Sequence, residues 1–132
     1  MDGVAVMRAL LLAHPPLTAL VKDRIVAGVV PQGMELPAVG ISEISRPPDL
    51  DTVARNGGSL VTARIQVTVH AKSYPQQKAL LKATKLGPGV YTGTIAGVAV
   101  RSVLADVVGP DLSDEAAGFF QQSRDYKVTY VE

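Results

Sequence analysis

The sequence predicts an α+β fold built on a mainly antiparallel β-sheet. Residues 60–71 alternate between apolar and more polar side chains, which is typical of a strand with one buried face. Residues 3–13 and 74–86 instead repeat apolar side chains at helical spacing. Helices that are grouped around strands that hairpins can link favour this fold class.

The first part of the chain is predicted to hold two helices and a strand. The apolar repeat of residues 3–13 stops at Pro15 and Pro16, because proline lacks a backbone donor and disfavours the helical conformation of the residue before it. Residues 17–22 then predict a short second helix. The β-branched run 25–30 favours a strand.

The middle of the chain combines a strand with a long polar segment. Pro37 stands where a sheet tolerates proline, at the start of a predicted strand over 38–45. Residues 46–58 follow, and they form the longest stretch without periodicity. This segment is too long for an ordinary hairpin turn and too polar for a core, so we expect an extended loop.

The helix predicted over 74–86 has clear sequence signals at both ends. Ser73 and Gln76 have the spacing of a capping box, and Pro75 lies in the first turn, where its missing donor costs nothing. The glycines of segment 87–89 end the helix.

The remainder of the chain predicts strands separated by turns. Residues 90–97 fit a short strand or a loop, whereas 98–107 favour a strand that Gly109 and Pro110 break. Residues 109–117 are expected to form a polar, acidic connection. The final strand is predicted over 118–131, and its apolar face carries Phe120, Tyr126, Val128 and Tyr130.

Composition limits the classes of function. A chain of 132 residues fits one domain, 1–132, and its formal net charge of +1 comes from 13 basic and 12 acidic residues without a cluster of like charges. The absence of cysteine excludes disulfides and thiolate chemistry. Asp2 and Arg8 flank and interrupt the first apolar run, so neither a secretory signal nor a membrane partner is expected.

The polar residues do not form a recognisable metal or cofactor motif. Neither His14 nor His70 has an acidic residue or a second histidine at ligand spacing. The glycines of segment 87–97 follow a helix, which is the reverse of a phosphate-binding loop. The polar strand face with Arg64 and His70 lacks interleaved aromatic residues, so it does not predict a platform for stacking bases. We therefore expect no catalytic site, no metal and no cofactor.

The acidic residues are predicted to be solvated turn residues or helix caps. Asp49 and Asp51 lie in the long loop, and Asp111, Asp114 and Glu115 lie in the later polar connection. A hydrolase would need such pairs held rigidly across a cleft with divergent pKa values. Nothing in their surroundings predicts that arrangement.

The order and spacing of several short motifs resemble those of phage tail-completion and tail-terminator proteins. The motifs span nearly the whole chain: MRALLLAHPPLTALV at 7–21, Asp23-Arg24-Ile25, Pro31-Gln32-Gly33, Leu36-Pro37, IQVTVHAKSY at 65–74 and RDYKVTY at 124–130. The resemblance implies a sheet with helices on one side, assembled as a homohexameric ring at the tail–neck junction of a virion. Assembly would take place in the host cytoplasm.

The resemblance also implies partners and a mechanism. The ring would sit on the major tail tube protein, stop tail polymerisation and present its other surface to a head-side connector or stopper protein. DNA would pass through the lumen with transient, non-specific backbone contacts. The mechanism would be geometric, because a ring closes when a heterologous contact repeats through a rotation that returns to its start. The resemblance implies no catalysis.

Two polar segments are candidates for the assembly contacts. The long loop contributes Arg46, Asp49, Asp51 and Arg55. The acidic connection is a second candidate and contributes Asp111, Asp114 and Glu115.

Two other functions compete with tail termination. The chain could instead be a head–tail connector or stopper subunit, which would share its size and loop-rich design. A small-ligand-binding or enzymatic α+β domain is the third possibility, and it predicts a concave pocket with convergent polar groups.

Overall fold

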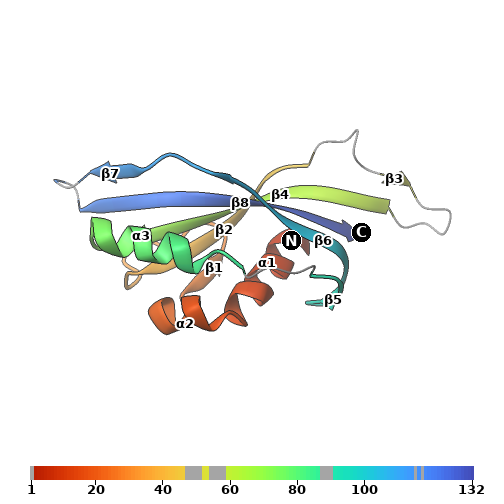
Figure 1. Cartoon of the computed structure of the whole chain (residues 1–132), viewed down its shortest axis with the longest axis horizontal. Helices are drawn as coiled ribbons and strands as arrows, with labels where there is room; N and C mark the ends of the chain where they lie inside the picture. Colours follow the sequence, from red (N-terminus) through yellow and green to blue (C-terminus); the bar gives the residue numbers. More distant parts are fainter. Residues whose placement is uncertain (1, 47–51, 54–58, 87–90, 115, 117) are drawn as a thin grey trace.

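The computed structural model describes residues 2–46, 52–53, 59–86, 91–114, 116 and 118–132, and in these residues three helices lie on one face of a single sheet (Figure 1). The helices are α1 (Asp2–Leu12), α2 (Pro15–Val21) and α3 (Tyr74–Ala83). The strands are β1 (Ile25–Ala27), β2 (Ala38–Ser45), β3 (Thr52–Val53), β4 (Ser59–Ala71), β5 (Gly93–Ile95), β6 (Val98–Val108), β7 (Leu112–Asp114) and β8 (Phe119–Val131). The predicted α+β fold is confirmed.

The sheet is antiparallel except at one edge. Its order is β1-β2-β4-β8-β6-β5, with β3 paired to β4 and β7 paired to β8. Among the described strands, β1 and β2 are the one parallel pair. The two longest strands, β4 and β8, pair along almost their whole length, from Leu60 opposite Val131 to Ala71 opposite Phe120. They form the centre of the sheet.

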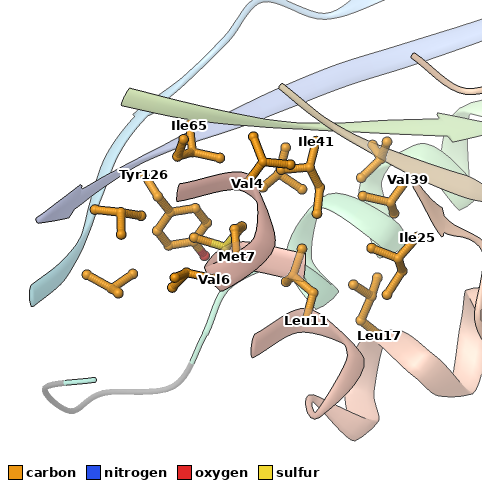
Figure 2. Close-up of a cluster of buried hydrophobic side chains, with 14 of the residues drawn as sticks. Val4, Val6, Met7, Leu11, Leu17, Ile25, Val39, Ile41, Ile65 and Tyr126 are labelled. Carbon is orange, nitrogen blue, oxygen red and sulfur yellow. The ribbon is translucent and has the colours of Figure 1, made fainter. Parts of the chain in front are cut away.

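The core lies between this central pair and the helices (Figure 2). The apolar face predicted for residues 60–71 is confirmed, since its odd-numbered residues, Val61 to Ala71, are all buried. Met7 and Leu11 of α1 pack in the same buried cluster as Ile65 of β4. Helix α1 can approach this closely because its residue 3 is glycine: a Cβ there would stand 2.9 Å from the Ile65 side chain.

The first two helices are separated as the prolines predict, although Pro15 and Pro16 belong to the second helix. They occupy the first turn of α2, where a missing donor costs no hydrogen bond. Leu17 and Val21 of this short helix are buried in the common core.

Helix α3 begins as predicted and ends earlier than predicted. The Ser73 hydroxyl accepts a hydrogen bond from the Gln76 amide at 3.3 Å, and the Gln76 side chain accepts one from the Lys72 amide at 2.7 Å. The helix stops at Ala83 rather than at residue 86. A side chain of β8 satisfies a backbone carbonyl at the end of this helix: the Tyr126 hydroxyl donates to the Thr84 carbonyl at 2.6 Å.

The predicted strand over 25–30 is shorter in the structure. Strand β1 ends at Ala27, and Gly28 then turns the chain with a φ of +96°. Residues 28–30, called the crossing segment below, then pass close to β2 at Gly40. A Cβ at Gly40 would stand 2.8 Å from the Gly28 carbonyl oxygen. Glycine at position 40 therefore permits the crossing that ends β1.

Two segments predicted as loops contain short strands. Within 46–58, Thr52 and Val53 pair with the start of β4, while residues 47–51 and 54–58 lie outside the described residues. Within 109–117, β7 pairs with β8 and continues along the side of β8 that β6 occupies. The second segment is therefore more than a connection, because part of it pairs with the strand that follows it.

Candidate assembly surfaces

Asp111 is the centre of a polar network that ties the β6–β7 connection to α3. Its carboxylate accepts hydrogen bonds from the Ser113 hydroxyl at 2.6 Å and from the buried Gln77 amide at 3.1 Å. Lys78 forms an ion pair with the same carboxylate at 3.1 Å. Gln77 also donates to the Gln121 carbonyl at 2.8 Å, so the network joins α3, β8 and the connection.

These donors favour the charged form of the Asp111 carboxylate. Hydrogen bonds from Ser113, then from Tyr74, Gln77 and Lys78, hold its pKa well below the usual range. The sequence predicted an acidic docking residue at this position. The structure places Asp111 in contacts within the chain, where it holds the edge of the sheet in position.

Arg46 also makes contacts within the chain. It lies just after β2, and its guanidinium forms an ion pair of 2.7 Å with Glu132, beyond the end of β8. A second, longer pair of 3.9 Å joins it to Glu43. Arg46 thus links the ends of two strands that are separated by β4.

The remaining predicted contact residues are mostly outside the described part of the chain. Asp49, Asp51, Arg55 and Glu115 fall there. For Asp114, the structure gives the backbone, which pairs with Phe119 at the end of β7. Among the described predicted contact residues, the structure therefore brings Arg46 and Asp111 to different places.

The sheet face opposite the helices is polar. Thr62 and Thr129 lie opposite each other on β4 and β8, with their hydroxyl oxygens 3.0 Å apart. Next to them, Arg64 lies between two carboxylates, 2.9 Å from Asp125 and 3.3 Å from Asp106. Arg64 is thus balanced by acids of the neighbouring strands.

His70 lies at the end of this polar face, beside the crossing of residues 28–30. A shallow hollow there is lined by His70, Gln121, Thr68 and the crossing segment. Burial lowers the pKa of His70, because a partly desolvated imidazole is harder to charge.

A row of exposed apolar side chains follows β6 and β7. Leu104 is 60% exposed, Val107 51%, Val108 43% and Leu112 49%. The sequence analysis did not single out these residues. The adjacent pair Val107-Val108 could have indicated an exposed apolar side chain in the sequence. Two neighbouring strand residues point to opposite faces of a sheet, so they cannot both enter a core on one face.

The described residues contain little that would form an enzymatic or metal site. Among them, no three His, Asp or Glu side chains gather closely enough to hold a metal ion. A hollow beside the start of α3 is lined by Lys72, Tyr74 and Ser113, and the charged groups near it, Lys78 and Asp111, are paired with each other.

No single helix of the described residues is long and apolar enough to cross a membrane. Helices α1 and α2 meet that criterion only as a pair, with a bend of 85° between them. Both contribute buried side chains to the core under the sheet.

The short motifs at residues 23–25 and 36–37 contact each other. The Arg24 guanidinium donates to the Pro37 carbonyl at 2.9 Å, and the Arg24 carbonyl accepts from the Val39 amide at 2.9 Å. Arg8 of α1 donates to the Ile25 carbonyl at 2.8 Å. These sequence features therefore fix the parallel β1–β2 edge against the first helix.

Residues 5–85, well over half of the chain, match the family described as Tail completion protein gp17. The chain belongs to this family. It is accordingly a structural protein of a phage tail. No curated protein matches the sequence.

The fold of this tail completion family member extends beyond the matched residues. A chain of the solved structure "Virion of native gene transfer agent (GTA) particle" is similar, with a TM-score of 0.64 and 16% sequence identity. The similarity covers 98% of this chain and 94% of that one. Strands β5 to β8, which follow the family match, are thus part of a shared fold.

Proposed function

We propose that the chain is a tail terminator. In this proposal residues 1–132 form one tail-terminator-like domain, and six copies form a ring at the tail–neck junction of the virion. The ring caps the major tail tube protein, ends tail polymerisation and provides the surface on which the head-side connector or stopper docks. DNA passes through the ring.

The family match over residues 5–85 carries this proposal. The similarity to a chain of a gene transfer agent virion supports it, because it spans nearly all of both chains.

The predicted contact residues enter the proposal in two ways. Arg46 and Asp111 contribute indirectly, since their contacts within the chain hold the strand ends and the β6–β7 connection in place. The long loop and the end of the acidic connection would contact neighbouring subunits or the tail directly through Asp49, Asp51, Arg55, Asp114 and Glu115.

Electron microscopy of particles that lack the protein tests the main proposal. Overlong tails without heads are the expected result, because nothing would stop polymerisation or join the head. Tails of normal length beside heads that leak DNA would instead identify a connector or stopper subunit. Intact, infectious particles would overturn both functions.

A deletion of residues 48–57 tests the role of the long loop. We expect particles with defective head joining or altered tail length. Normal tails and full head joining would contradict a contact role for the loop. A double substitution of exposed lysines at the end of α3 and just beyond it, Lys82→Ser and Lys85→Ser, is the control and should leave assembly unchanged.

A further inference from the structure

The sheet has two edges with unpaired backbone among the described residues. On one side, β5 pairs only with Val98 to Val100, which leaves the rest of β6 without a described outer partner. On the other side, β1 pairs only with Val39 to Ile41, which leaves Ser42 to Ser45 of β2 open. An unpaired strand edge is a template for another strand.

Both open edges carry exposed apolar side chains. Leu104 and Val107 lie on the open stretch of β6, and Ile44 lies on the open stretch of β2. A monomer usually protects an open strand with charged side chains or proline at such positions. Apolar residues there are typical of a strand edge that another chain covers.

We propose that the open edge of β6 pairs with the open edge of β2 of a second copy of this chain. The proposal deepens the proposed function, because it names the contact that repeats around the ring. A ring needs two different surfaces on each subunit. The two edges of one sheet supply them.

Strand direction favours this pairing. The neighbours β2 and β4, β4 and β8, and β8 and β6 are all antiparallel, so β6 runs opposite to β2. Copies related by a rotation about an axis along the strands keep their strand directions. The new pair would therefore be antiparallel and would continue the alternation of the sheet.

The charges of the two edges are complementary. Asp106 of β6 is paired with Arg64 within the chain, whereas Arg101 is exposed and has no ion-pair partner among the described residues. This leaves a positive charge on the β6 edge. On the β2 edge, Glu43 is exposed, and its described ion pair with Arg46 is long, at 3.9 Å.

The cysteine-free sequence permits a direct test by cross-linking. The double variant Ser42→Cys/Ser102→Cys places one thiol on each edge, and both positions face the polar side of the sheet, opposite Gln66 and Thr129. Assembled particles would be treated with a short bis-maleimide and run on a denaturing gel. We expect a ladder of covalent multimers of this chain.

The single variants and the pair Ser42→Cys/Lys82→Cys are the controls, since Lys82 lies on α3 away from the edges. The single variants should give no species above a dimer, and the control pair should give no ladder. Assembled particles without a ladder from the edge pair would overturn the proposal. Cross-links to a different protein would overturn it as well.

Charge placed on the edge gives a second test. Leu104→Lys/Val107→Lys should leave the melting temperature of the isolated chain unchanged and lower the yield of joined particles at least tenfold. The control Leu20→Lys changes an apolar residue on α2 that is 43% exposed and should assemble normally. Normal yield from the edge variant would refute the pairing, while the phenotype of particles lacking the protein would still test tail termination separately.

Discussion

Asp111 is predicted as an assembly contact, and the structure adds a role within the chain that the sequence did not reveal. Its sequence context, Gly109-Pro110-Asp111, is that of a solvated turn. The structure adds Gln77 and Lys78, which α3 brings from more than thirty residues earlier in the chain. No local pattern could reveal these partners, because the fold alone brings them together.

Asp111→Asn tests this role through pH. The folded protein lowers the pKa of the Asp111 carboxyl below its ordinary value of 3.8, so the stabilisation is present above that pH and is lost as the pH falls below it. We expect a lower melting temperature than wild type at pH 7 and a smaller difference at pH 3. Glu35→Gln, whose ion pair with Arg24 is 3.9 Å long, is the control and should melt like wild type.

His70 predicts a second pH dependence, with its own window. Because burial lowers its pKa from 6.5, the unfolded chain binds the proton more readily, and stability falls as the pH drops below 6.5. His70→Gln should reduce the loss of stability between pH 6.5 and 5, as measured by urea unfolding. An unchanged pH profile would show that His70 is not the group responsible.

At the scale of elements, segments with a repeating pattern were predicted, and short segments without one were not. Strand β4 and the start of α3 followed from alternation and from the Ser73 cap. The short strands β3 and β7 did not, because two or three residues are too few to show an alternation, although each pairs with the strand that follows it in the sequence. Strand β1 was predicted too long, since the crossing at Gly40 is a contact between distant residues.

The end of α3 depends on Tyr126 of β8. Its hydroxyl donates to the Thr84 carbonyl and accepts from the Leu86 amide at 3.1 Å, and it is buried. Tyr126→Phe removes both bonds and should destabilise the protein by about 1–3 kcal/mol in urea unfolding. Lys85→Ala, an exposed change at the same helix end, should stay within about 0.5 kcal/mol of wild type.

The crossing over β2 depends on Gly40. A methyl group there would stand 2.8 Å from the Gly28 carbonyl oxygen, which is backbone and moves only with its segment. Gly40→Ala should therefore cost about 1–3 kcal/mol, measured by chemical denaturation. Ser45→Ala on the exposed end of the same strand is the control, and equal stability of the two variants would contradict this account.

For the whole molecule, one buried cluster joins residues from α1 to β8. We therefore expect a single cooperative unfolding transition. The chain has no tryptophan, so tyrosine fluorescence can follow the core around Tyr126 and Tyr130 while far-ultraviolet circular dichroism follows the backbone. Two separate transitions would contradict a single domain.

The surfaces of the molecule were predicted less well than its core. Sequence patterns identified residues 46–58 and 109–117 as the unusual segments, because they lack periodicity. The open edges of β2 and β6 carry ordinary strand sequences, and only the strand order shows that they have no outer partner among the described residues. A sheet edge cannot be recognised before the topology is known.

The position of β8 has a consequence for synthesis. It is the latest strand in the sequence, yet it lies between β4 and β6 in the sheet. While residues 119–131 are still being translated, β4 lacks its longest partner and β6 lacks its main one. Such distant pairing folds late. A copy cut short by early termination would therefore lack the middle of its sheet and could not take a place among finished subunits.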